Sequence, residues 1–157
     1  ASIFRDLTVK DNIDLALQNS TYSRAAIRNR REQLINEFNL NNFVDNYGYQ
    51  LSGGERRRCE IARALTVGRK GPKYLLLDEP FAGIDPLAVN DLKKLILKLS
   101  SDGVGILITD HNVRETLLIT NKSYVLSEGK ILAFGSSSEL ADNPIVKKYY
   151  LGDNFKL

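Results

Sequence analysis

The chain has 157 residues, of which 43% are hydrophobic and 26% are charged, with a formal net charge of +3 at pH 7. This balance indicates a globular domain with a core and excludes an intrinsically disordered chain. No apolar run approaches the roughly 18 residues of a membrane span, and a single cysteine, Cys59, excludes an intramolecular disulfide.

The first 70 residues are predicted to be almost entirely helical. Apolar residues recur at helical spacing over 7–18 and again over 22–40, and Thr8 is a candidate N-cap for the first of these helices. Residues 41–50 read as an irregular link. The arginines of the second helix are followed by glutamates and lack interleaved aromatic residues, which favours a solvated helix face over a nucleic-acid surface.

The stretch "LSGGERRR", residues 51–58, opens a third helix. Ser52 and Glu55 have the spacing of a capping box, which explains these two residues without a ligand. It does not explain Gly53 and Gly54, because each glycine costs roughly 1 kcal/mol relative to alanine in a helix. A helix N-terminus with small residues also suits an anion, so two readings remain open: a capped helix, and a turn that faces a phosphate.

From residue 71 onward the pattern changes to alternating strands and helices. The apolar run 73–78 predicts a strand buried on both faces, and 104–110 predicts a second. Between them, a helix is expected from the cap Asp85 to a glycine at 103. A short helix, a hairpin over 122–135 that turns at "SEGK", and a helix capped by a second capping box follow. This order predicts an α/β fold with a parallel strand pair.

Ionisable residues follow both predicted strands. Asp78 and Glu79 close the first strand, and His111 follows the second. Because ligands bind at the carboxyl ends of strands in open α/β sheets, one carboxylate could hold Mg²⁺ and the other could deprotonate a water. Taken singly, an Asp-Glu pair reads as an acidic loop junction and a lone histidine as a hydrogen-bonded surface or core residue.

Together these motifs resemble the ABC-type ATPases. In chain order they are "LSGGE", a basic helix, a strand ending in "DEP", the loop "AGIDP" and a strand ending in histidine. The resemblance implies a partial P-loop ATPase fold, with a helical subdomain over 1–70 and part of a RecA-like sheet core over 71–157.

The resemblance also assigns roles to individual residues. Leu51, Ser52, Gly53, Gly54 and Glu55 would form the signature motif, which contacts ATP held by a second subunit. Asp78 would hold Mg²⁺ through water, Glu79 would be the catalytic glutamate and His111 the switch histidine. Asp85 would belong to the D-loop, beside its role as a helix cap.

The finer resemblance is to the ATPase subunits that drive lipopolysaccharide export in Gram-negative bacteria. "ITDHNVRETL" and the ending "YLGDNFKL" support it, and the importers of branched-chain amino acids are the alternative. This resemblance implies that two ATPase subunits pair head to tail and that the coupling helices of transmembrane permease subunits bind them. It implies no nucleic acid as a partner, and a place on the cytoplasmic face of the inner membrane. Phe4 and Arg5 would contact the permease.

The sequence departs from the family in lacking the Walker A pattern G-x-x-x-x-G-K-[ST] and the Q-loop glutamine. We therefore expect the chain to be the C-terminal part of a subunit, inactive by itself because the phosphate cradle is missing. Two further alternatives are a non-catalytic module that docks on a membrane subunit, and a chromosome or DNA-repair ATPase. The absence of heptad repeats argues against the latter.

Overall fold

The computed structural model describes residues 3–18, 22–68 and 71–152. Contacts divide the chain into two units, Ala1–Leu77 with Gly83–Leu107, and Asp78–Ala82 with Ile108–Leu157. The predicted division after residue 70 stays a prediction. The end of the "YLGDNFKL" tail, residues 153–157, lies outside the described residues.

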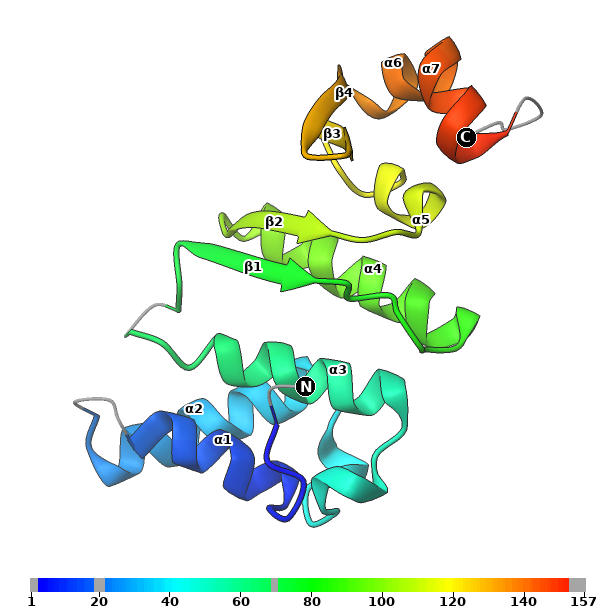
Figure 1. The fold of residues 1–157 in the computed structure, drawn as a ribbon. Coiled ribbons are helices and arrows are strands. Elements are labelled where there is room, and N and C mark those ends of the chain that lie inside the picture. The colour runs from blue at the N-terminus through cyan, green and yellow to red at the C-terminus, as the bar shows by residue number, and fades with distance from the viewer. Residues whose placement is uncertain (1–2, 19–21, 69–70, 153–157) are drawn as a thin grey trace. The chain divides into compact units, whose positions relative to one another are not determined.

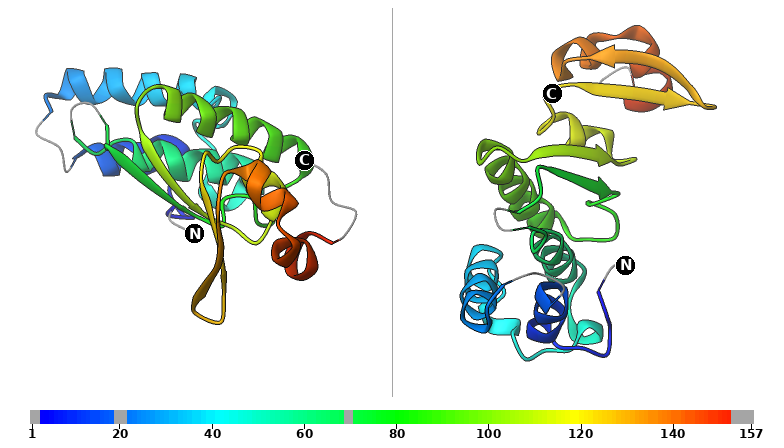
Figure 2. Two further views of the ribbon diagram at one scale, coloured as in Figure 1. Left: turned by 90° about the horizontal axis from the view of Figure 1, so that it is seen from above. Right: turned by 90° about the vertical axis from the view of Figure 1, so that its left-hand side faces the viewer.

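The first unit contains a group of helices, α1 (Val9–Gln18), α2 (Arg24–Glu37) and α3 (Gly53–Ala64), and the two 3₁₀ turns Asn41–Phe43 and Gly48–Gln50. Helix α1 packs against both α2 and α3 (Figures 1 and 2). Their apolar faces form a core that includes Val9, Ile13, Leu17, Leu34, Phe38, Cys59, Ile61 and Ala62. The helical prediction for this half of the chain is therefore confirmed.

Strands β1 (Tyr74–Asp78) and β2 (Gly105–Thr109) pair in the same direction, connected by helix α4 (Pro86–Ser101). Helix α4 begins at the predicted cap, because Asp85 accepts hydrogen bonds from the N–H groups of Leu87 and Ala88, at 3.1 and 3.0 Å. It lies along one face of the strand pair (Figure 2). The crossover helix explains the parallel pairing, as two parallel strands need a long connection.

The prediction that β1 and β2 are each buried on both faces is wrong. In β2, Leu107 is 61% exposed. In β1 the side chains alternate. Leu75 and Leu77 are buried, but Tyr74 and Leu76 are 75% and 73% exposed. Successive side chains of a strand point to opposite faces, and within the described chain α4 covers one face only. A run of leucines in the sequence does not show how many faces of the strand are covered.

The second unit contains α5 (Val113–Leu117), the antiparallel hairpin β3 (Ser123–Ser127) and β4 (Lys130–Gly135), and the helices α6 (Ser137–Asp142) and α7 (Pro144–Val146), followed by a π-helical turn. The hairpin turns at Glu128 and Gly129, which both have positive φ, as a tight hairpin turn requires. Leu117, Leu140 and Val146 form its small core. No helix among the described residues has the length and apolar character to span a membrane.

Candidate functional site

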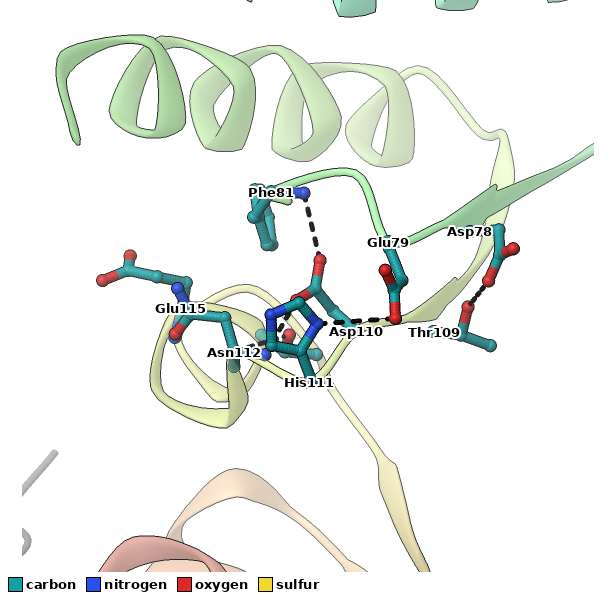
Figure 3. Close-up of polar contacts among 9 residues, drawn as sticks. Asp78, Glu79, Phe81, Thr109, Asp110, His111, Asn112 and Glu115 are labelled. Atoms are coloured by element: carbon teal, nitrogen blue, oxygen red, sulfur yellow. Dashed lines mark hydrogen bonds and ion pairs between the residues drawn. The ribbon is translucent and has the colours of Figure 1, made fainter. Parts of the chain in front are cut away.

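The carboxyl ends of β1 and β2 bring together the acidic residues and the histidine that the sequence singled out (Figure 3). The backbone N–H of Glu79 donates to the Thr109 carbonyl at 2.7 Å, which continues the strand pairing by one residue. The Thr109 hydroxyl donates to the carboxylate of Asp78. Asp78, Glu79 and Thr109 thus share one edge of the strand pair.

Glu79 and His111 face each other at this edge. The distance from His111 Nδ1 to Glu79 Oε1 is 3.4 Å, and both side chains are exposed. His111 is the only histidine in the chain, and its side chain is neither in the core nor remote from the acidic pair. A carboxylate beside an imidazole, both open to solvent, is an arrangement that can hold and move a proton.

The backbone of Glu79 has a conformation that is unusual for a residue with a side chain. Its φ is +45°, in the left-handed region, and its carbonyl accepts a hydrogen bond from Ala82 N–H at 3.2 Å. Such a conformation costs about 1–3 kcal/mol and occurs most often at functional sites. The tight turn directs the chain away from the strand and leaves the Glu79 carboxylate exposed.

Asp110 is part of the same cluster, and the sequence analysis missed it. Its side chain is fully buried, and its carboxylate accepts hydrogen bonds from Phe81 N–H at 3.0 Å and from Asn112 N–H at 2.8 Å. The bond to Asn112 is an Asx turn, for which the sequence does carry a signal: an apolar run that ends in Asp followed by two polar residues.

The signature stretch forms the capped helix start that was predicted. Ser52 Oγ accepts from Glu55 N–H at 3.3 Å, and Glu55 Oε2 accepts from Ser52 N–H at 2.8 Å. Leu51 is buried, and its carbonyl accepts from Arg56 at 3.3 Å. The N–H groups of Gly53 and Gly54 lie in the first turn, where a helix has no carbonyl of its own to accept them.

The two glycines also have a packing reason within the chain. A Cβ at Gly54 would lie 2.6 Å from the Cβ of Ala88, and one at Gly53 would lie 2.9 Å from the Gly83 carbonyl oxygen and 3.0 Å from Ile84. Real Cβ atoms do not approach other atoms below 3.0 Å. The start of α3 therefore packs directly on the start of α4 and the loop before it, which the sequence reasoning had not considered.

Phe4 and Arg5 are held in a turn by a buried residue that sequence reasoning also missed. Asn12, on α1, accepts from Phe4 N–H at 2.8 Å and donates to the carbonyls of Phe4, Leu7 and Thr8 at 2.9–3.1 Å. Phe4 is 51% exposed, and the guanidinium of Arg63 lies 5.1 Å from its ring centroid, in cation–π geometry. Arg5 is exposed. Phe4 is therefore not a core residue.

The donor groups at the strand ends fit Mg²⁺ better than a metal that needs several protein ligands. Among residues 3–18, 22–68 and 71–152 no group of three or more His, Cys, Asp or Glu could hold a metal ion. Mg²⁺ keeps most of its waters and needs only one or two carboxylates, so the exposed Asp78 could serve as its protein ligand.

Cys59 is unsuited to chemistry, because burial raises the pKa of its thiol to about 12.

Comparison with known proteins identifies relatives of the chain. The family profile described as ABC transporter matches residues 1–82. The chain is 49% identical over its whole length to the lipopolysaccharide export system ATP-binding protein LptB of Haemophilus influenzae, and 48% identical over 99% of its length to that of Acidithiobacillus ferridurans. It spans 64% of the length of each of these relatives.

Solved structures with a similar fold include parts of ABC transporters. The structure of cbiO1 from Clostridium perfringens, part of the ABC transporter complex cbiONQ, superposes with a TM-score of 0.80 at 27% identity, over 94% of this chain and 58% of that one. The ADP conformation of MJ1267, an ATP-binding cassette of an ABC transporter, gives a TM-score of 0.78 at 24% identity, over 95% and 64% of the two chains. The predicted α/β fold, as part of an ABC nucleotide-binding domain, is confirmed.

Proposed function

The chain belongs to the ABC transporter family, and on that premise we propose that it forms part of a subunit that hydrolyses ATP to drive transport. The observation that carries the proposal is the 3.4 Å approach of Glu79 Oε1 and His111 Nδ1, at strand ends that also bear Asp78. In this role Glu79 accepts a proton from the attacking water. His111 would hydrogen-bond the terminal phosphate of ATP, and Asp78 would hold Mg²⁺ through a water.

Within the proposed site, Mg²⁺ would supply charge neutralisation on the phosphates. The residues of this chain would orient the attacking water and accept its proton. The signature stretch, Leu51 to Glu55, would close on ATP held by a second copy in a head-to-tail pair, which a helix N-terminus suits because its N–H groups and dipole attract anions. Asp85, in the loop before α4, would lie at the same interface. The phosphate cradle would come from the remaining part of the subunit, so the 157 residues alone would be inactive.

We further propose that the transported substrate is lipopolysaccharide, moved by a complex at the inner membrane whose permease subunits contact this subunit from the membrane side. The full-length relatives named LptB support this assignment over an importer of branched-chain amino acids.

The test is to reconstitute the full-length subunit with its permease in vesicles. We expect lipopolysaccharide to change the ATPase rate and branched-chain amino acids to leave it unchanged. The opposite pattern would contradict the assignment.

Asp78→Asn should weaken the Mg²⁺ dependence of hydrolysis in the full-length subunit. The amide keeps the shape of the side chain but loses the charge that attracts Mg²⁺, so a higher Mg²⁺ concentration is needed for half-maximal rate. The measurement is the ATPase rate against Mg²⁺ concentration, with the exposed Asp142→Asn as the matched control. An unshifted Mg²⁺ profile for Asp78→Asn would remove this residue from the metal site.

Phe4→Ala should leave stability nearly unchanged but reduce co-purification with the permease. Phe4 is half exposed and lies next to Arg5 and Arg63, and aromatic and arginine side chains often dominate binding at interfaces. We expect a stability loss well below the roughly 3–5 kcal/mol that truncation of a buried phenylalanine costs. Phe38→Ala, at a fully buried position, is the control that should show that larger loss. A large fall in the melting temperature of Phe4→Ala with partner binding intact would contradict the proposal.

A further inference from the structure

Asp110 links the loop that follows Glu79 to the loop that carries His111. Its Oδ2 accepts from the N–H of Phe81, two residues after Glu79, and its Oδ1 accepts from the N–H of Asn112, next to His111 (Figure 3). The distance from Asp110 Oδ1 to His111 Nδ1 is 3.9 Å, so Asp110 does not hydrogen-bond the imidazole directly. One buried carboxylate thus joins the two backbone segments.

The backbone largely decides where the two exposed side chains lie. The side chains of Glu79 and His111 are 55% and 72% exposed, so packing restricts them little. Glu79 also has a left-handed backbone, which persists only where its surroundings hold it. The bond from Phe81 N–H to Asp110 fixes the far side of that turn, and the bond from Glu79 N–H to Thr109 fixes the near side.

We propose that Asp110 is a positioning residue that sets the distance between Glu79 and His111 by holding the Phe81 and Asn112 amides on one carboxylate. The inference rests on the proposed function, in which Glu79 and His111 act on ATP and water. A carboxylate suits the role because both of its oxygens accept hydrogen bonds. Asparagine offers one such oxygen and turns an NH₂ group toward the second amide, and alanine offers none.

The first test measures ATP hydrolysis in the full-length subunit. Asp110→Ala should lower kcat by at least about tenfold, because small displacements of reacting groups slow catalysis strongly, while KM for ATP stays within about threefold. Asp110→Asn should lie between Asp110→Ala and the parent. Asp142→Asn, an exposed residue of the same unit, is the matched control and should keep the parental rate. A kcat within twofold of the parent for Asp110→Ala would overturn the proposal.

The second test detects the displacement without hydrolysis. In an NMR spectrum of the histidine rings, the His111 signal is identified as the one lost in His111→Ala. We expect this signal to shift in Asp110→Ala and Asp110→Asn, well below their melting temperatures, and to stay in place in Asp142→Asn. An unshifted His111 signal would mean that Asp110 only stabilises the fold. If Asp110→Ala does not fold, the ATPase rate and the His111 signal are both measured on Asp110→Asn.

The two tests separate this inference from the function on which it rests. If Glu79→Gln leaves hydrolysis intact, the catalytic role of Glu79 is wrong, whatever the His111 signal does. If Glu79→Gln stops hydrolysis while Asp110→Ala changes neither kcat nor the His111 signal, the ATPase assignment stands and the positioning role of Asp110 is wrong.

Discussion

Glu79→Gln is expected to slow ATP hydrolysis in the full-length subunit by at least about 100-fold, with ATP binding preserved. General base catalysis contributes about 10²–10⁴-fold to a rate, and an amide of the same shape cannot accept the proton of the attacking water. The substitution keeps the length of the side chain and leaves the left-handed turn at residue 79 with the same backbone demand. The effect should therefore fall on kcat and leave KM for ATP largely unchanged.

The measurement is the steady-state rate of phosphate release, together with ATP affinity by isothermal titration calorimetry. Glu128→Gln makes the same chemical change at an exposed hairpin turn, which also has a positive φ, and should keep the parental rate. A Glu79→Gln rate within tenfold of the parent would remove Glu79 from the catalytic role. Loss of ATP binding would point instead to a role in binding the nucleotide.

Gly54→Ala is expected to destabilise the protein by about 1–3 kcal/mol, the usual cost of overpacking. In an unpacked helix the same change would stabilise by up to about 1 kcal/mol, so helix propensity and packing predict opposite signs. We expect the packing cost to exceed the gain in helix propensity, because the new Cβ would lie 2.6 Å from the Cβ of Ala88, on helix α4. Neither atom is at the end of a flexible side chain, so one of the two helices has to move.

A double-mutant cycle measures this contact in thermal or denaturant unfolding. Ala88→Gly removes the obstructing atom and leaves only the Cα of residue 88, at 3.9 Å, so it should largely cancel the cost of Gly54→Ala. Gly53→Ala is the matched control, since its Cβ would meet the Gly83 carbonyl and Ile84, which Ala88→Gly does not relieve. Equal costs of Gly54→Ala in both backgrounds would show that the contact with Ala88 does not cause the loss of stability.

Much of the local structure could be predicted because its causes lie close together in the sequence. The capping boxes at Ser52–Glu55 and Ser136–Glu139 need only residues three apart, and the cap at Asp85 acts on the next three residues. The hairpin depends on a two-residue turn at Glu128 and Gly129. Such features form wherever the chain is free to adopt them, so the order of helices and strands, and with it the α/β class, followed from the sequence.

The place of the candidate site residues was also predictable, for a different reason. Two acidic residues and a histidine directly after two apolar strands must lie at one edge once the strands run parallel, because parallel strands end on the same side of a sheet. Asp78, Glu79 and His111 do lie at this edge. Their approach to 3.4 Å, and the left-handed backbone of Glu79, depend on how the two loops fold and were not predicted.

The sequence by itself thus determined the elements, the fold class and the residues at the strand ends, all of which follow from neighbours along the chain. Only the tertiary structure decided which groups meet across it. A Cβ at Gly54 has no room because Ala88 lies against it, the carboxylate of Asp110 joins two loops because the Phe81 amide reaches it, and Leu76 is exposed because α4 covers the other face of its strand. Each of these depends on residues brought together by folding, and no local pattern encodes such a contact.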